Sequence, residues 1–259
     1  MPRARINGVG LYYEVNGQGP PLLLGHGFAG TARMWDTQVR PLSQRHEFIT
    51  YDLRGHGQTE TPPSLSQYSV DIVVEDMSQL LRLLGIKRGV IGGLSLGGYL
   101  ALHFYFQHKE MVTALLLIDT GPGYRSEKGK QQWNARRIAC AELLEKKGIV
   151  AFADSEYAIN DYYTPRELML TLNPIGLANV SRGVMLNPAL ADRLSEIDVP
   201  TLIVVGERDT GFLEATDYMH KHIRNSKKVV IANAGHGVNV DQPEVFNSTV
   251  LNFLKAIGI

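Results

Sequence analysis

Short apolar runs recur along the chain, separated by glycines and polar stretches. Runs of this length, without alternation of polar and apolar positions, are typical of strands buried on both faces of a parallel sheet. Six runs predict such strands: Pro21–Leu24, Phe48–Tyr51, Gly89–Ile91, Ala114–Ile118, Leu202–Val205 and Val229–Ile231. The segment Gly8–Val15 is instead expected to form hairpin strands at an edge of the sheet.

Helical periodicity lies between these runs. From Val70 to Leu84 the apolar residues keep a spacing of three or four, and Gly85 stands where a glycine commonly ends a helix. A second helix is expected to begin at Pro243 and to bury one apolar face. Strands that alternate with helices in this way predict an α/β fold with a mostly parallel, doubly wound sheet.

The alternation stops over about residues 122–198, where the sequence is helical and irregular and rich in aromatic residues and methionine. Ser126 is expected to cap a helix that runs to Gly148. An insertion between two sheet strands usually covers the end of the sheet where open α/β folds bind ligands. We therefore expect one domain, residues 1–259, with a helical lid at about residues 122–198.

Composition narrows the class of protein. The 259 residues include 26 Lys+Arg and 26 Asp+Glu, so the net charge is zero, which argues against a nucleic-acid or anionic-membrane partner. No apolar run approaches the ~20 residues that span a bilayer, and the opening residues lack the apolar core of a signal peptide. The single cysteine, Cys140, excludes an internal disulfide and a multi-cysteine metal site. We expect a soluble, cytoplasmic protein that acts on a small molecule without a metal or cofactor.

The segment Gly93-Leu94-Ser95-Leu96-Gly97 follows a predicted strand and opens a helical stretch. It matches the pattern G-x-S-x-G in the strand–turn–helix context that the pattern requires. Glycines allow the sharp turn and close packing of strand against helix, while the turn exposes the serine hydroxyl. The alternative is a glycine-rich turn without a catalytic role. We predict that Ser95 is a nucleophile and that the Leu96 amide faces the negative charge that develops on the substrate.

A serine nucleophile needs an imidazole base and a carboxylate that orients the imidazole. His236 follows the last predicted strand and Asp209 follows the strand before it, at the same sheet edge as Ser95. Ser, then Asp, then His is one of the chain orders that serine hydrolases use. The alternatives are a loop-capping carboxylate and a plain turn histidine. Four further histidines lie in helical sequence and are expected at the surface: His103, His108, His220 and His222.

An oxyanion hole needs a second backbone donor besides Leu96. The segment Gly25-His26-Gly27-Phe28 follows the strand at Pro21–Leu24 and can supply the Phe28 amide. Glycine permits the close backbone approach that such a donor requires, which favours this role over the alternative, in which the glycines only allow a turn.

Four segments together resemble the α/β-hydrolase superfamily, and more narrowly its small bacterial esterase and enol-lactonase branch: His26–Phe28, Asp52–Thr59, Gly93–Gly98 and Ala234–His236. The resemblance implies a triad of Ser95, Asp209 and His236, with oxyanion donors at Phe28 and Leu96.

The same resemblance implies that Asp52–Thr59 is a structural turn, so Arg54 and His56 are not expected to be catalytic. It also makes Asp119 the second choice for the triad acid, because some relatives keep the acid there. Relatives with an aspartate nucleophile are excluded, since Ser95 occupies that position.

The leading hypothesis is a serine hydrolase that cleaves small carboxylic esters or lactones through an acyl-enzyme. The same triad could serve a menaquinone-pathway-type lyase, a carbon–carbon bond hydrolase or a cofactor-free perhydrolase. A receptor built on a hydrolase scaffold is disfavoured by the intact triad. Trp133, Tyr157 and Tyr162 are expected to line an apolar substrate pocket, although they could instead only hold the lid to the body.

Overall fold

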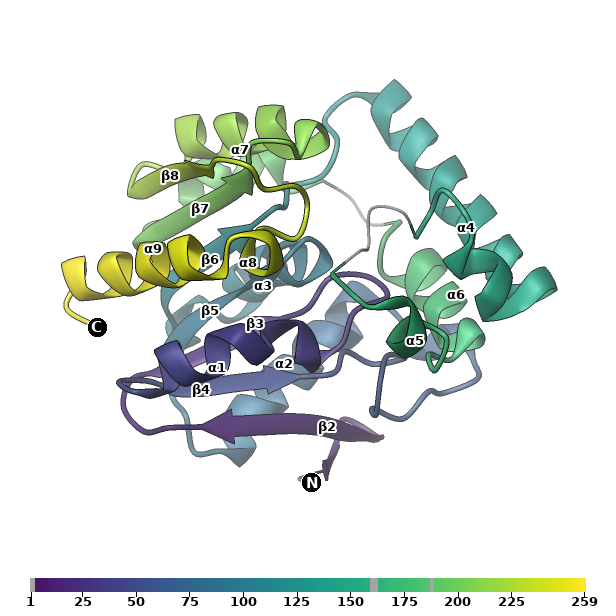
Figure 1. The fold of residues 1–259 in the computed structure, drawn as a ribbon, viewed down its shortest axis with the longest axis horizontal. Coiled ribbons are helices and arrows are strands. Elements are labelled where there is room, and N and C mark those ends of the chain that lie inside the picture. Colours follow the sequence, from purple (N-terminus) through teal and green to yellow (C-terminus); the bar gives the residue numbers. More distant parts are fainter. Residues whose placement is uncertain (1–2, 159–162, 187–188) are drawn as a thin grey trace.

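The computed structural model describes residues 3–158, 163–186 and 189–259. The strands in these ranges are β1 (Arg3–Ile6), β2 (Val9–Asn16), β3 (Pro21–Gly25), β4 (Glu47–Tyr51), β5 (Gly89–Leu94), β6 (Val112–Ile118), β7 (Thr201–Gly206) and β8 (Ser226–Ile231). They form an eight-stranded sheet in the order β1-β2-β4-β3-β5-β6-β7-β8 (Figure 1). Strands β3 to β8 run parallel, and β2 is antiparallel to both of its neighbours. The predicted parallel sheet is confirmed. A hairpin lies at its edge, but the predicted segment Gly8–Val15 supplies only β2, and the first strand, β1, precedes it.

Helices cover both faces of the sheet. Those on the faces are α1 (Asp36–Ser43), α2 (Val70–Leu83), α3 (Leu96–His108), α7 (Thr210–His222), α8 (Val238–Asp241) and α9 (Pro243–Ala256). Three others belong to the insertion: α4 (Glu127–Ala153), α5 (Arg166–Met169) and α6 (Pro174–Gly183). Helices α2, α3 and α7 share one apolar core with the sheet, and α1, α8 and α9 share the other (Figure 1). Alternate strand residues face opposite cores: Leu23 belongs to the first, Leu22 and Leu24 to the second. Burial on both faces explains why these strands read as continuous apolar runs.

Helix ends follow the capping signals in the sequence. The Ser126 hydroxyl accepts a hydrogen bond from the Gly129 amide at 3.1 Å at the start of α4. At Gly148 the backbone turns to φ 76° and ψ −172°, which breaks the helix where the sequence predicts its end. A short continuation to Ala153 beyond this kink was not predicted.

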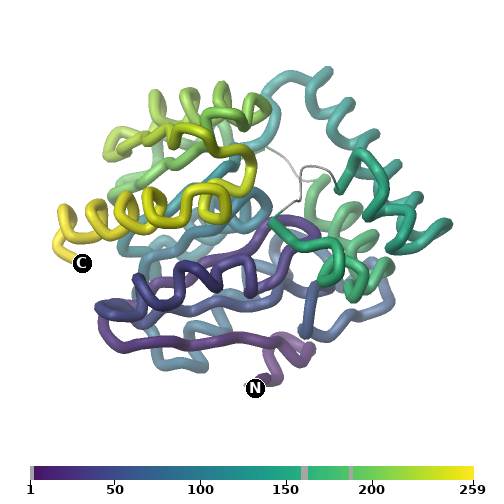
Figure 2. Tube along the Cα trace, viewed as in Figure 1, coloured from purple at the N-terminus to yellow at the C-terminus, as the bar shows by residue number. Residues whose placement is uncertain are grey.

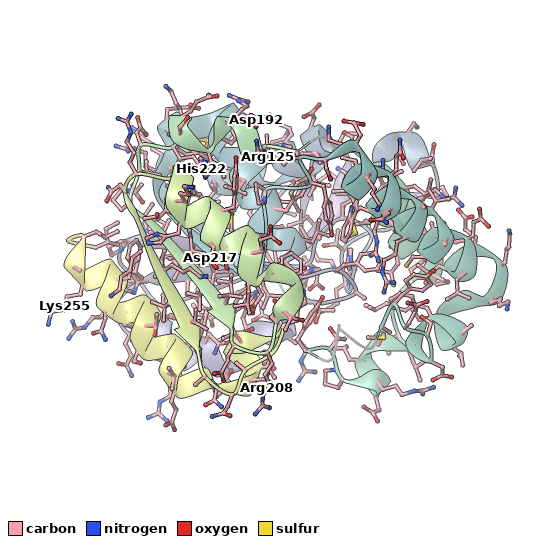
Figure 3. The ribbon with its side chains drawn as sticks, turned by 90° about the horizontal axis from the view of Figure 1, so that it is seen from above. Arg125, Asp192, Arg208, Asp217, His222 and Lys255 are labelled. Atoms are coloured by element: carbon pink, nitrogen blue, oxygen red, sulfur yellow. The ribbon has the colours of Figure 1, made fainter. Side chains whose placement is uncertain are left out.

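The insertion, residues 122–198, lies between β6 and β7 and carries α4, α5 and α6. Figure 2 shows its teal and green helices gathered to one side of the body. Its two ends meet: the Leu190 amide donates to the Pro122 carbonyl at 2.7 Å, and Arg125 pairs with Asp192 at 3.6 Å (Figure 3). The insertion therefore leaves and rejoins the sheet at one place, without disturbing the strand order.

None of the helices in the described ranges is long and apolar enough to cross a membrane.

Candidate active site

Two backbone segments touch at the carboxyl end of the sheet because glycines line both. A Cβ at Gly97, at the start of α3, would lie only 2.2 Å from the carbonyl oxygen of Gly25, at the end of β3. This contact requires glycine at position 97. It brings the loop after β3, which holds Phe28, beside the turn that holds Ser95.

Ser95 occupies a strained turn between β5 and α3. Its φ of 52° and ψ of −110° are unusual for a residue with a side chain and cost about 1–3 kcal/mol. Hydrogen bonds on both sides hold this conformation: the Ser95 amide donates to the Ile118 carbonyl at 2.9 Å, and the Thr120 hydroxyl donates to the Ser95 carbonyl at 2.7 Å. Neighbouring strand β6 thus supports the predicted nucleophile.

Asp209 and His236 meet at the ends of β7 and β8. The His236 Nδ1 atom lies 2.8 Å from Asp209 Oδ2, and both side chains are largely buried. The ring of Phe212 stacks on the imidazole, with centroids 4.9 Å apart and planes at 21°. A carboxylate at Nδ1 leaves Nε2 as the nitrogen that can take a proton from a nucleophile.

Asp119 supports the same edge of the sheet in a different way. Its carboxylate accepts hydrogen bonds from the Gly206 amide at 2.9 Å and from the Val238 amide at 3.1 Å. Burial raises the pKa of Asp119 well above its usual value; the charge of His236 acts against this shift, and that of Asp209 adds to it. Asp119 therefore links the end of β7 to the loop that follows His236 through hydrogen bonds to backbone amides. The carboxylate that is hydrogen-bonded to His236 Nδ1 is that of Asp209.

The two predicted oxyanion donors sit at adjacent strand ends. Leu96 is the first residue of α3, where an amide has no acceptor within the helix. Phe28 lies in the loop after β3. Among the described residues, neither amide has a hydrogen-bond acceptor. Both are therefore available to a substrate oxygen.

A cavity of about 390 Å³ separates this edge of the sheet from the insertion. Its walls include Ser95, Leu96 and Phe212 from the body, and Tyr124, Trp133 and Met185 from the insertion. Among the described residues that line it, Lys130 is the only one with a charged side chain. An uncharged, largely apolar group suits such a wall.

The three predicted pocket residues have different outcomes. Trp133 lines the cavity, where its indole nitrogen donates to the Met185 carbonyl at 2.7 Å. Tyr157 does not lie on the cavity wall; its ring packs against the Arg136 guanidinium, 5.0 Å away, beyond the kink in α4. Tyr162 lies outside the described residues. Tyr124 and Met185 belong to the insertion that the sequence marks as rich in aromatic residues and methionine, whereas Phe212, on α7, was not predicted to line the cavity.

The expectation that His103 lies at the surface is wrong. His103 is buried on α3, with its ring against Tyr99 at a centroid distance of 4.5 Å. Burial lowers its pKa to about 4. Helical periodicity fails here because α3 is covered on nearly all sides. In the described ranges, no group of three His, Cys, Asp or Glu side chains is placed to hold a metal ion.

Comparisons with known proteins agree with this architecture. Residues 20–142 match the model of a protein family whose description is alpha/beta hydrolase fold. A Bacillus subtilis protein described as a 2-succinyl-6-hydroxy-2,4-cyclohexadiene-1-carboxylate synthase is 31% identical over 96% of both chains. The 3-oxoadipate enol-lactonase 1 of Acinetobacter baylyi is 26% identical, over 95% of this chain and 94% of the relative. A thermophilic esterase of Thermogutta terrifontis superposes with a TM-score of 0.90 over 100% of both chains, at 28% identity.

Proposed function

This chain belongs to the α/β-hydrolase family, in its small bacterial esterase and enol-lactonase-like branch, and we propose that it is a serine hydrolase of small carboxylic esters or lactones. The observation that carries the proposal is the 2.8 Å hydrogen bond between His236 and Asp209 at the sheet edge where the strained turn presents Ser95. A hydroxyl, an imidazole and an orienting carboxylate are the parts that acyl transfer requires.

In the proposed reaction, Ser95 Oγ attacks the substrate carbonyl and His236 Nε2 takes the hydroxyl proton. The amides of Phe28 and Leu96 donate hydrogen bonds to the oxyanion of the tetrahedral intermediate. His236 then gives its proton to the leaving alcohol. Water then gives a proton to the same imidazole and attacks the acyl-enzyme, and His236 returns that proton to Ser95 Oγ as the acid leaves. Asp209 stabilises the imidazolium in both halves of the cycle.

A panel of esters and lactones tests the proposal. Wild-type protein should hydrolyse short-chain p-nitrophenyl esters, and Ser95→Ala should lower kcat by about 10⁴–10⁶ with the fold intact, as loss of a triad nucleophile does. A fluorophosphonate should label the wild type once, at Ser95, and EDTA should leave the rate unchanged. Labelling that persists in the alanine variant would contradict the assignment of the nucleophile.

A lyase that uses the same triad is the second candidate. The Bacillus subtilis relative, described as a synthase, matches 96% of this chain and favours this alternative. In such a reaction His236 would mainly move protons rather than support an acyl-enzyme. Fluorophosphonate labelling of Ser95 without turnover of any ester or lactone would favour the lyase. Steady ester hydrolysis favours the hydrolase.

A further inference from the structure

The Phe28 N–H group belongs to the Gly27–Phe28 peptide unit, and hydrogen bonds to the Gly27 carbonyl hold this unit in place. The Gly27 carbonyl accepts hydrogen bonds from the Gly30 amide at 3.0 Å and from His26 Nδ1 at 2.7 Å. His26 Nε2 accepts from the Leu53 amide at 2.9 Å, and burial lowers the pKa of this imidazole well below its usual value. The ring is therefore neutral with its hydrogen on Nδ1. Donors at this carbonyl polarise the peptide and strengthen its N–H group as a donor.

The next peptide unit, Phe28–Ala29, is held at both ends. Its carbonyl accepts a hydrogen bond from the Tyr163 hydroxyl at 2.6 Å, and its N–H donates to His56 Nε2 at 3.2 Å. Burial lowers the pKa of His56 to about 4, so Nε2 stays an acceptor at neutral pH. Ala29 has a φ of 55°, a conformation that a side chain disfavours. This turn therefore depends on partners that fix its peptide plane.

Tyr163 comes from the insertion, 135 residues away from Phe28 in the sequence. Its side chain is buried directly over the loop, since a Cβ at Gly27 would lie 2.5 Å from its hydroxyl oxygen. Its ring lies 6.2 Å from the ring of His236. Phe152 of α4 also packs edge-on against the Phe28 ring, at 6.0 Å. The insertion thus reaches the loop by a polar contact as well as by apolar packing.

We propose that Tyr163 and His56 are positioning residues for the oxyanion hole, which fix the Phe28–Ala29 peptide plane and so aim the Phe28 amide at the substrate oxygen. This inference rests on the proposed function. It gives the insertion a part in the chemical step besides forming the pocket wall. Because a negative oxygen exists only in the transition state, the loss of either partner should lower kcat far more than it raises KM.

Tyr163→Phe tests the proposal, and Tyr68→Phe is its matched control. Both tyrosines are 3% exposed, and the Tyr68 hydroxyl donates to a backbone carbonyl too, that of Pro62 at 2.8 Å. In Tyr163→Phe we expect kcat for p-nitrophenyl butyrate to fall about 10- to 100-fold, since losing a whole oxyanion donor costs about 10²–10³. KM should stay within about twofold, and the Ki of an alkylboronic acid should rise in parallel with the loss of kcat. Tyr68→Phe should leave kcat and Ki within about twofold of wild type.

Two variants of His56 distinguish the loss of the hydrogen-bond acceptor from the loss of the packed ring. His56→Gln keeps an acceptor and should retain most of kcat, whereas His56→Leu removes it and should lower kcat about as much as Tyr163→Phe. Wild-type kcat and boronic acid affinity in Tyr163→Phe, or equal losses in Tyr163→Phe and Tyr68→Phe, overturn the positioning role. An inactive wild type on every ester and lactone overturns the proposed function itself, before any variant is compared.

Discussion

At the scale of single residues, two buried carboxylates lie at the same sheet edge with different partners. Asp209 is hydrogen-bonded to His236 Nδ1, whereas Asp119 accepts from two backbone amides. Asp209→Asn should lower kcat by about 10⁴, because an amide at Nδ1 selects the wrong imidazole tautomer. Asp119→Asn should cost only about tenfold and lower the melting temperature, since an asparagine side chain has one acceptor oxygen for two amides. The measurements are kcat on one ester and thermal unfolding. The reverse ranking of kcat would make Asp119 the triad acid.

At the scale of elements, α4 presents Trp133 to the cavity, while Tyr157 packs beyond its kink. Trp133→Ala should change the ratio of kcat/KM between a short-chain and a longer-chain ester by about tenfold, because each methylene that a pocket accommodates contributes about 1–3 kcal/mol. Tyr157→Ala should lower the melting temperature and leave the ratio unchanged. The test compares both variants on an acetate and an octanoate ester. An unchanged ratio in Trp133→Ala would show that the acyl group binds elsewhere.

At the scale of the whole molecule, buried neutral histidines couple folding to pH. The pKa of His103 is lowered to about 4, against 6.5 in an unfolded chain. Between these values the unfolded state binds the extra proton, so the free energy of unfolding falls as the pH drops from 6.5 to 4. At pH 5 the loss from one such histidine is about 2 kcal/mol.

Replacing His103 by leucine should remove this part of the pH dependence. His103 Nε2 is buried without a hydrogen-bond partner in the described part of the chain, so the substitution removes a polar atom that is already unpaired. Urea unfolding at pH 7 and pH 5 should show a smaller loss of stability in His103→Leu than in wild type. Equal losses in the two proteins would mean that His103 protonates in the folded state.

The sequence by itself determined much of the secondary structure of this protein. Apolar runs placed the parallel strands, Ser126 and Gly148 marked the start and the kink of the long helix in the insertion, and glycines marked the sharp turn that holds Ser95. These signals are local: burial on both faces of a strand, helix capping and left-handed backbone all depend on a few consecutive residues.

Tertiary structure decided which of these residues act together. It brought Tyr163 to Phe28 across 135 residues of sequence. It also buried His103, and it placed Trp133, but not Tyr157, on the cavity wall. None of these outcomes has a local signature, because a hydrogen bond or a cavity wall depends on how the insertion folds back over the sheet. That path is set by packing between distant segments rather than by the periodicity within any one of them.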